Sequence, residues 1–379
     1  MRIALLCSDS REGLREYDQP RPTFGTAPAA LLRGLAEIAG VEIHVLSCIQ
    51  RQVESPEKLS DNTWFHSVHV PQIGWLRTGY QGCIRAVRKR LRTINPDVVH
   101  AQGTERECAM SGAFSFRPNL LTIHGNMRRL ARINRSRPFT FHWLTARLEG
   151  FVLPRFTGVV CITNHTRELV RDKARRTWVV PNAVDPLFFE VAPAPAKEPV
   201  LVCVGTVCAN KNQVRLIQAL DPLAASAAFK LAFFGDIAAD AYGNEFRHLI
   251  GQRSWCHFGG FADRAALREI LRTARMLILP SLEDNCPMAV LEAMAAGVPV
   301  LAAKVGGLPD LITESETGLF CNPYDGATIL AGVRRVLDDP DFGRQLAGRA
   351  KSAALARFHP VAVARRHVEI YREVWQAAS

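Results

Sequence analysis

The chain has 379 residues, of which 48% are hydrophobic and 22% are charged, a composition typical of a soluble globular protein with room for two domains. Its apolar runs fall short of the roughly 18 residues that cross a bilayer, so the sequence argues against a helical membrane protein. The net charge of +11 favours anionic partners without choosing among nucleotides, nucleic acids and membrane surfaces.

The cysteines and the N-terminus indicate the compartment. Ten cysteines are scattered without a CxxC pair, and several lie in apolar strand-like runs, which favours buried, reduced thiols over a zinc cluster. The opening MRIALLCSDS has one basic residue and a short apolar run that passes directly into polar sequence. We interpret it as a β-strand, not a signal peptide, and expect a cytoplasmic protein without a metal site.

Short β-branched runs alternate with helix-length segments along the whole chain. In the first half the expected strands are 3–7, 41–46, 98–100, 120–124, 159–163 and 179–181. In the second half they are 200–204, 231–234, 255–258, 276–279, 298–302 and 318–320. Near-continuous apolar runs suit strands covered on both faces, and the alternation indicates βαβ units. The sequence therefore predicts an α/β protein with two doubly wound, Rossmann-like domains.

The expected linker is the Pro- and Ala-rich segment 191–199, VAPAPAKEP, which has neither a helical nor a strand period. We expect an N-terminal domain over 1–190, a C-terminal domain over 200–357, and a last helical segment over 358–379. The apolar stripe of that segment comprises Val361, Ala364, Val368, Tyr371 and Trp375. Because ligands bind outside the carboxyl ends of parallel strands, a cleft between the domains is the expected site.

The polar loop after the expected strand 276–279 leads into a predicted helix. Asp284 or Asn285 can cap this helix, Pro287 fits its first turn, and Gly297 fits its end. Free N–H groups and the helix dipole make such an N-terminus an anion site.

Two carboxylates flank that helix start. Asp284 and Glu292 would lie about 12 Å apart if the rise were helical throughout, which matches the span from the sugar to the ribose of a sugar nucleotide. From spacing alone, a capping aspartate and a solvated helical glutamate are an equally good interpretation.

A second loop, GTVCANKNQ, follows the expected strand 200–204 and starts at Gly205. A glycine at a strand end allows close backbone approach, and Lys211 at the next helix start can pair with phosphate. Alone this pattern is weak, but with the first loop it places two anion-binding elements at one sheet edge.

These loops resemble segments of the retaining glycosyltransferases of family 4. DNCPMAVLEAMAAGVPV resembles the family's signature, in which an acidic residue is followed at a fixed spacing by Glu, and GTVCANKNQ resembles its phosphate-binding loop. VVPNAVD resembles the PNGVD segment, and DVVHAQG and LTIHG resemble the family's N-domain strand ends. The order matches over nearly the whole chain. The resemblance implies a GT-B fold, in which two Rossmann-like domains face a cleft and the C-terminal helix crosses back to the N-domain.

The resemblance also implies roles for individual residues. Asp284 would hold donor-sugar hydroxyls, Glu292 the ribose and Lys211 the diphosphate, while His124 would lie beside the anomeric centre. His100 has a similar context without the following glycine, and we interpret it as structural. The expected catalytic residues are His124, Lys211 and Asp284. The expected donor-binding residues are Gly25, Thr26, Gly125, Gly205, Thr206, Lys211, Glu283, Asp284, Asn285, Cys286, Pro287, Met288 and Glu292.

Some positions depart from the family's pattern. The first acidic position holds Asp284 where the family has Glu, with Glu283 beside it, and which of the two reaches the sugar is open. Thr206 stands where the phosphate loop has Arg, and Ala183 where PNGVD has Gly.

We therefore expect a glycosyltransferase that moves a sugar from a nucleotide diphosphate sugar to a glycan or lipid-linked acceptor. The resemblance implies retention, no metal and no cofactor, and the pathway expected for the family is synthesis of cell-surface polysaccharide or glycolipid. Two alternatives stay open: a nucleotide-sugar epimerase of the same architecture, and an inactive nucleotide- or carbohydrate-binding homologue. A dinucleotide oxidoreductase is disfavoured because no GxGxxG follows the first strand.

Two basic clusters lie in the N-terminal half. The first lies on a predicted amphipathic helix over 82–95, which is either an ordinary solvated face or a surface that docks to an anionic membrane, with Trp75 nearby. Its basic residues are Arg85, Arg88, Lys89, Arg90 and Arg92, of which Arg85, Arg88, Lys89 and Arg92 form the proposed membrane contact. The second cluster, which can instead meet an anionic acceptor, is Arg128, Arg129, Arg132, Arg135 and Arg137. No nucleic-acid partner is expected, because aromatic residues are not interleaved with the basic ones and no recognised module appears.

Overall fold

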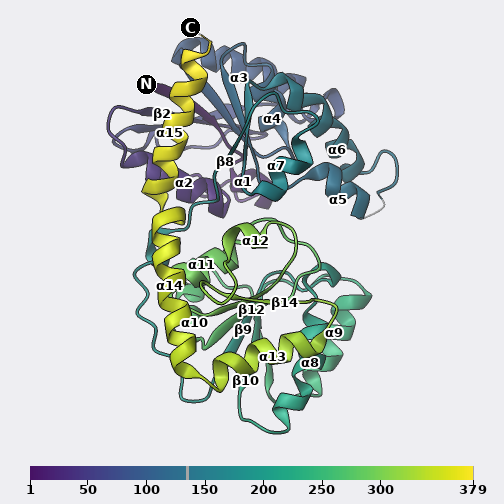
Figure 1. Ribbon diagram of the computed structural model, residues 1–379. Coiled ribbons are helices and arrows are strands. Elements are labelled where there is room, and N and C mark those ends of the chain that lie inside the picture. The colour runs from purple at the N-terminus through teal and green to yellow at the C-terminus, as the bar shows by residue number, and fades with distance from the viewer. Residues whose placement is uncertain (134–135, 379) are drawn as a thin grey trace. The chain divides into compact units, whose positions relative to one another are not determined.

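The structure is a computed structural model in which residues 1–133 and 136–378 are described. It contains two compact units, each built on its own β-sheet (Figure 1). The first unit combines Met1–Ala183 with the described residues from Pro360 onward, and the second unit is Val184–His359. Arg135, a member of the second basic cluster, lies outside the described residues.

The unit boundary differs from the sequence-based one. The sequence places 184–190 in the N-terminal domain, whereas in the structure these residues belong to the second unit. One reason is a long-range ion pair that no local pattern indicates, in which Arg264 Nη1 lies 3.2 Å from Asp185 Oδ2. Segment 191–199 is irregular, as predicted, and it belongs to the second unit as well.

The sheet of the first unit has the strand order β3-β4-β2-β1-β5-β6-β7-β8. All neighbouring strands are parallel except the edge strand β3, which runs antiparallel to β4. The strands are β1 (Arg2–Leu6), β2 (Glu42–Ile49), β3 (Lys58–Ser60), β4 (Thr63–His69), β5 (Val98–Gln102), β6 (Asn119–Ile123), β7 (Gly158–Cys161) and β8 (Thr177–Val179). The sequence predicts all of these except β3 and β4. The predicted strands rest on continuous apolar runs. β4, with sequence TWFHSVH, has no such run because it is only partly buried.

Helices cover both faces of this sheet. Successive side chains of β1 enter opposite cores, with Ile3 and Leu5 on one face and Ala4 and Leu6 on the other. The first core is closed by α2 and α15, and the second by α3, α4, α6 and α7. The helices of this unit are α1 (Ser10–Leu14), α2 (Thr26–Ala36), α3 (Gln81–Ile94), α4 (Glu107–Ala113), α5 (Met127–Ile133), α6 (Phe141–Val152), α7 (Asn164–Val170) and α15 (Pro360–Gln376).

The C-terminal helix α15 packs against α2 (Figure 1). Gly34 permits the close contact between the two helices, because a Cβ at this position would lie 2.1 Å from the carbonyl oxygen of Pro360. The predicted stripe is only partly correct: Ala364, Val368 and Tyr371 are buried, but Trp375 is 43% exposed and Val361 is half-buried. The buried face of α15 also includes Val363, His367, Ile370 and Val374.

The second sheet is entirely parallel, with the strand order β11-β10-β9-β12-β13-β14. All six strands were predicted: β9 (Val200–Val204), β10 (Lys230–Phe234), β11 (Cys256–Gly260), β12 (Met276–Leu279), β13 (Val300–Ala303) and β14 (Leu319–Cys321). The helices are α8 (Gln213–Ala224), α9 (Ala241–Gly251), α10 (Arg264–Thr273), α11 (Met288–Ala296), α12 (Leu308–Leu311), α13 (Gly326–Leu337) and α14 (Pro340–Phe358).

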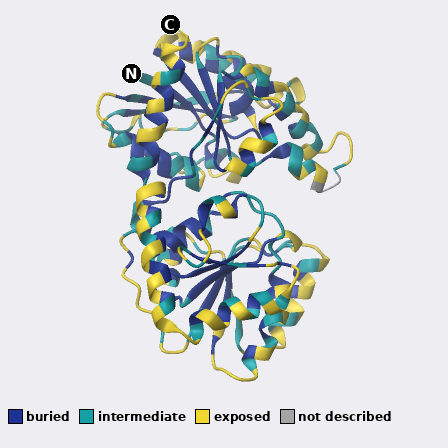
Figure 2. Cartoon of the chain, viewed as in Figure 1, coloured by how far each residue is buried: buried dark blue, intermediate teal, exposed yellow. Residues whose placement is uncertain are grey.

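In each unit the central strands are buried and the outer faces of the helices are exposed (Figure 2). In the second unit, α8, α9 and α13 contribute to the core on one face of the sheet. α10 and α11 contact β9 and β12 respectively. The loops that follow β9 and β12 therefore emerge side by side at the carboxyl edge, because these two strands are paired neighbours.

Candidate functional site

The centre of the site in the second unit is an ion pair between the two predicted loops. Lys211 Nζ lies 2.5 Å from Asp284 Oδ2, and both side chains are largely buried. Ser281 Oγ donates to the same carboxylate oxygen at 3.1 Å. The structure thus brings together Lys211 and Asp284, which are far apart in sequence, as the resemblance implies.

Hydrogen bonds to backbone carbonyls fix the two loops to each other. Asn210 Nδ2 donates to the carbonyl of Glu283 at 2.8 Å, and the N–H of Leu282 donates to the carbonyl of Asn210 at 2.7 Å. Asn212, in the left-handed backbone conformation, donates to the carbonyl of Pro280 at 3.1 Å. Because the loops are cross-linked in this way, the loop after β12 helps to set the position of Lys211 in the loop after β9.

Two glycines permit this packing. Gly306 has φ +54°, and a Cβ there would lie 1.8 Å from the carbonyl oxygen of Asp284, so no larger residue fits. The N–H of Gly307 donates to that same oxygen at 2.9 Å. Gly205 has φ +143°, and the nearest atoms to a Cβ there belong to the Lys211 side chain at 3.7 Å. A Cβ at this position would be in ordinary van der Waals contact, so it is the positive φ that favours glycine at the end of β9.

Glu283 and Asp284 have different surroundings. Asp284 presents its carboxylate to Lys211, and its Oδ1 also accepts from the N–H of Asn285 at 3.2 Å. Glu283, in contrast, accepts the hydrogen bond from Asn210 Nδ2 through its backbone carbonyl. The side chain at the centre of the site is that of Asp284.

The N-terminus of α11 lies directly after this loop. The predicted caps are wrong: the N-cap residue is Pro287, which makes no side-chain cap hydrogen bond. Neither Asp284 nor Asn285 caps the helix because it begins at Met288, so the N-cap position falls beyond both. Gly297 ends the helix in the left-handed conformation, as predicted. Cys286 is buried and Met288, the first helical residue, is half-buried. A helix end without a side-chain cap suits an anionic ligand.

Glu292, near the middle of α11, is 4% exposed. Burial raises its pKa to about 7, an effect that the charge of Arg264 opposes and that of Asp185 reinforces. The interpretation of a solvated helical glutamate is therefore wrong. Arg264 and Asp185 are not among the predicted site residues, although Asp185 is the last residue of VVPNAVD.

Thr206 is exposed after Gly205, and its carbonyl accepts from Gln213 Nε2 at 3.1 Å. It brings no charge to the position where the family has Arg. Among the predicted site residues, Lys211 therefore provides the positive charge in the loop after β9.

His124 follows β6 in the first unit. Its Nε2–H donates to Gln102 Oε1 at 2.9 Å. Burial lowers its pKa to about 4, and a hydrogen bond with Asn182 opposes that shift. His124 is therefore a neutral donor near pH 7. His100 is fully buried and bonded to Tyr371 and Thr122 at 2.8 and 2.7 Å, which fits its structural interpretation.

The first turn of α2 lies close to His124. Ala27 of α2 and His124 line the same small pocket. Gly25 is the N-cap of α2 and Thr26 is its first residue, and within the described chain this cap makes no side-chain hydrogen bond. Gly125 is half-buried, and a Cβ there would lie 3.4 Å from Glu105 Oε1. The structure thus places the first turn of α2 near His124, and the roles of Gly25, Thr26 and Gly125 stay predictions.

The carboxylate of Glu149 is buried and is not among the predicted site residues. Its Oε2 accepts from the N–H of Met127 and from Thr104 Oγ1, both at 2.8 Å, so it satisfies the N-terminus of α5 directly after His124 and Gly125. Burial raises the pKa of Glu149. No sequence pattern indicates this contact, because Glu149 comes from the far end of α6.

The first basic cluster lies on α3. Its apolar face is buried as predicted, and Arg85, Lys89 and Arg92 are exposed. Arg88 differs, because its Nε donates to the carbonyl of Phe114 and its guanidinium lies 4.0 Å from the ring centroid of Phe116. Trp75 does not reach a membrane surface: it is buried and donates through Nε1 to the carbonyl of Val70 at 3.0 Å.

The second cluster borders a groove between α5 and α6. Arg128 pairs with Asp172 at 3.1 Å, and Arg147 lies 4.8 Å from the ring centroid of Trp143. The residues that line this groove include Arg128, Arg132, Trp143, Arg147 and Lys173. Aromatic rings therefore do lie beside basic side chains here, which weakens the sequence-based argument against nucleic acid.

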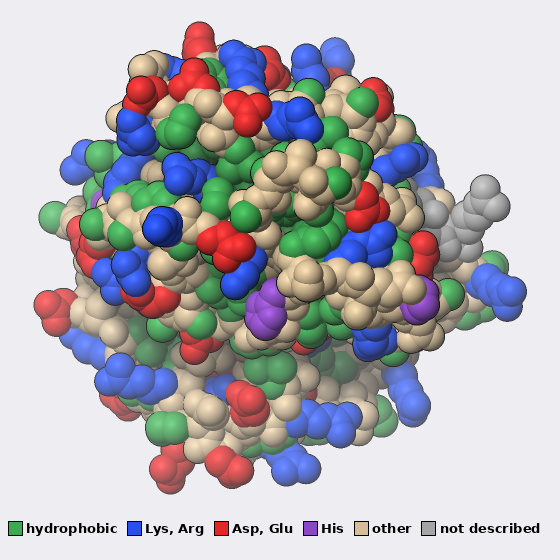
Figure 3. All heavy atoms as spheres, turned by 90° about the horizontal axis from the view of Figure 1, so that it is seen from below, with side chains coloured by type: hydrophobic (Ala, Val, Ile, Leu, Met, Phe, Trp, Pro, Cys, Tyr) green, Lys and Arg blue, Asp and Glu red, His purple; other side chains and the backbone are tan. Residues whose placement is uncertain are grey.

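The face shown in Figure 3 carries basic and acidic side chains interspersed, not one basic region. No helix of the described residues is long and apolar enough to cross a membrane. Among residues 1–133 and 136–378, no three His, Cys, Asp or Glu side chains are grouped as ligands for a metal ion.

Comparison with solved structures defines the fold. Sucrose-phosphate synthase from Thermosynechococcus elongatus superposes with a TM-score of 0.78 at 21% identity, covering 100% of both chains. Anabaena HepE in complex with UDP gives a TM-score of 0.71 at 18% identity, covering 98% of this chain and 100% of that one. The protein therefore has the GT-B glycosyltransferase fold with two Rossmann-like domains, as predicted.

Sequence comparison gives the family. Residues 165–353 match the family model described as glycosyl transferases group 1, and residues 26–187 match glycosyltransferase family 4. The chain belongs to this glycosyltransferase family, which confirms the resemblance seen in the sequence.

Curated relatives agree with this assignment. 2-Deoxystreptamine glucosyltransferase of Streptomyces kanamyceticus is 30% identical over 216 residues, 52% of this chain and 56% of that enzyme. An uncharacterized glycosyltransferase of Methanocaldococcus jannaschii is 28% identical over 46% of this chain and 45% of its own length. The chain spans about half the length of these two relatives. Alpha-D-kanosaminyltransferase of S. kanamyceticus is 24% identical over 76% of this chain and 80% of that enzyme.

Proposed function

We propose that this protein transfers a sugar from a nucleotide diphosphate sugar to a glycan or lipid-linked acceptor, with retention and without a metal. The observation that carries the proposal is the junction of Lys211, Asp284 and the N-terminus of α11 at one sheet edge. A lysine and a helix N-terminus without a side-chain cap supply the positive charge that a diphosphate needs. Solved structures of HepE with UDP and with UDP-glucose add support for a nucleotide-sugar donor.

Each site residue has a distinct task in this proposal. Lys211 stabilises the charge that develops on the departing nucleoside diphosphate. Its present partner, Asp284, would turn to donor-sugar hydroxyls once the diphosphate competes for the ammonium group. Glu292, as a carboxylate, would accept hydrogen bonds from the ribose. His124 would donate to the sugar from the first unit.

The first experiment offers the purified protein a panel of UDP-, GDP- and ADP-sugars and measures nucleoside diphosphate release with and without a glycan or membrane extract. Release that depends on the extract is expected. Conversion of the donor to another sugar nucleotide would replace the proposal with an epimerase, and binding without turnover would replace it with an inactive homologue. The anomeric configuration of the product, measured by NMR, tests retention: an inverted product contradicts it.

The acceptor proposal rests on the first unit. We propose that exposed Arg85, Lys89 and Arg92 contact an anionic membrane that carries a lipid-linked acceptor, on the inner face of the cell membrane. Arg88 is left out because Phe114 and Phe116 engage it.

Flotation with vesicles of phosphatidylglycerol and phosphatidylcholine tests this contact. Binding should increase with the anionic fraction and fall when the three residues are changed to Gln. Equal binding to neutral vesicles would remove the membrane proposal. The groove beside Trp143 would then be the better candidate for an anionic acceptor.

A further inference from the structure

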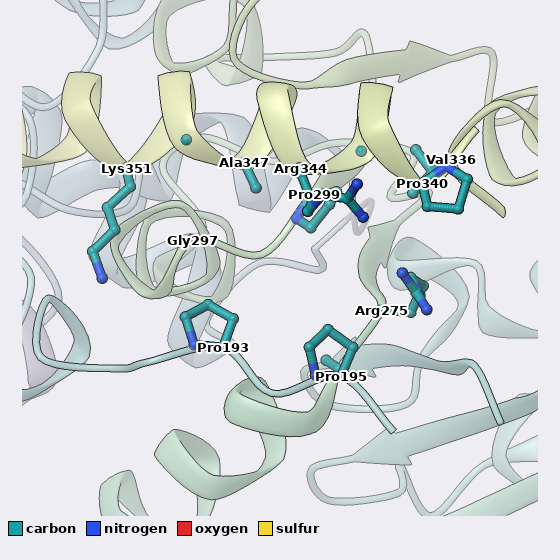
Figure 4. A pocket seen from close by; sticks show the side chains of 13 residues that line it. Pro193, Pro195, Arg275, Gly297, Pro299, Val336, Pro340, Arg344, Ala347 and Lys351 are labelled. Atoms are coloured by element: carbon teal, nitrogen blue, oxygen red, sulfur yellow. The ribbon is translucent and has the colours of Figure 1, made fainter. Parts of the chain in front are cut away.

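The second unit contains a cavity that the sugar-transfer site does not use (Figure 4). Its volume is about 520 Å³, within the range of small-molecule sites. Arg275 and Pro299, which line it, immediately precede β12 and β13, so the cavity lies at the amino edge of the sheet. Lys211 and Asp284 follow the carboxyl ends of β9 and β12, so the two sites lie at opposite edges.

Three cationic side chains line the cavity, and its lining residues include no carboxylate. Lys351 and Arg344 extend from one side of α14 in Figure 4, and Arg275 comes from the start of β12. Lys351 Nζ donates to the carbonyl of Val191 at 2.8 Å, and Arg344, nearer to solvent, pairs with Asp341.

Arg275 is the informative residue. Its Nε is buried and has no hydrogen-bond partner among the described residues. A guanidinium N–H that is removed from water and unpaired costs free energy, so its presence at a cavity wall points to a ligand or water that accepts from it. Burial also lowers the pKa of Lys351, and a nearby anion would reverse that effect.

The opposite wall is apolar and rigid. Pro193 and Pro195 of the linker face α14, with Pro299 and Gly297 between them (Figure 4). The linker is held in place because the N–H of Ala194 donates to the carbonyl of Arg272 at 2.8 Å. The cavity therefore offers cations for an anionic group and an apolar wall for the body of a ligand.

We propose that this cavity binds a small phosphomonoester, such as a sugar phosphate or a nucleoside monophosphate. Arginine and lysine together match a phosphate dianion, since arginine donates in a fork and lysine acts as a point charge. The proposal does not rest on the sugar-transfer function, because it needs neither a donor nor an acceptor.

Isothermal titration calorimetry with glucose 6-phosphate and with AMP tests the site, with glucose as the uncharged comparator. Binding of at least one phosphomonoester and none of glucose is expected. Arg275→Gln should weaken that binding about tenfold or more, because a hydrogen bond to a charged group is lost. Since Arg275 supports a strand start, Lys351→Met, at a half-buried position on α14, is the second variant and should weaken binding similarly.

Lys211→Ala is the matched control, since it removes a cation from the other edge of the same sheet. It should leave phosphomonoester binding unchanged. Binding lost in Lys211→Ala but kept in Arg275→Gln and Lys351→Met would place the ligand in the donor site and overturn the proposal. Equal binding of glucose, or no binding of either phosphomonoester at millimolar concentration, would also overturn it.

Discussion

Replacement of Glu292 by Gln should stabilise the second unit at alkaline pH and much less at acidic pH. Glu292 is 4% exposed, and burial raises its pKa from 4.5 to about 7. The folded protein therefore holds this proton more tightly than the unfolded chain does between these two values. The stability from that proton is fully present below pH 4.5 and is lost as pH rises through 7.

The magnitude follows from the shift. Relative to its value at low pH, the raised pKa lowers the free energy of unfolding by about 3 kcal/mol at pH 8 but by only about 1 kcal/mol at pH 5.5. Glutamine has almost the same volume and no charge, so the variant avoids this cost at every pH. Its stability advantage should therefore grow by about 2 kcal/mol, roughly 30-fold in the unfolding equilibrium, between pH 5.5 and pH 8.

Hydrogen–deuterium exchange of α11 peptides is a suitable assay, because it reports on the second unit alone. Variant and parent are compared at the same pH, so that the intrinsic exchange rate cancels. Glu245→Gln, an exposed position on α9, is the matched control and should show no pH-dependent gain. An advantage for Glu292→Gln that is equal at pH 5.5 and pH 8 would refute the buried-charge reasoning. Loss of donor binding in the same variant would separately support the ribose role.

Three further predictions concern Lys211 and Gly306 in the second unit and His124 in the first. Lys211→Ala should lower the rate of nucleoside diphosphate release by a factor on the order of 10²–10³. The control Lys230→Ala, at an exposed position in the same unit, should not lower it. Equal rates in the two variants would contradict the leaving-group role. Gly306→Ala should lower the melting temperature and weaken donor binding, since its Cβ would lie 1.8 Å from the carbonyl oxygen of Asp284. Unchanged values would contradict this. Gly251→Ala, with open space around it, is the control. His124→Ala should reduce turnover, and NMR of the parent should show its ring neutral from about pH 5 upward, because burial lowers the pKa to about 4; a titration near pH 6.5 would contradict this.

The parallel sheets were predictable because buried strands leave continuous apolar runs. β9 and β12 match their predicted bounds, whereas β4 was not predicted because its sequence TWFHSVH mixes polar and apolar residues. Family resemblance assigned Lys211 and Asp284 to one donor site; the structure shows the two side chains in contact, and their roles stay a prediction. Spacing alone could not show that Glu292 is buried, because its surroundings come from other segments of the chain.

Other features needed the folded structure for the same reason. Glu149 reaches the turn after His124 from the far end of α6, a contact set by helix packing. Asp284 was a plausible helix cap by its position, yet the lysine of another loop engages it. Local patterns assign propensities, and they do not say which long-range partner takes precedence.

The place of α15 has a consequence for how the chain is made. The core that α2 helps to close also requires Val368 and Tyr371, which leave the ribosome only after the whole second unit has been synthesised. Until then, one face of the first sheet has no complete cover, and its apolar residues stay exposed to solvent. The second unit is continuous in sequence and can fold first, so the N-terminal half of this protein is the last to be completed.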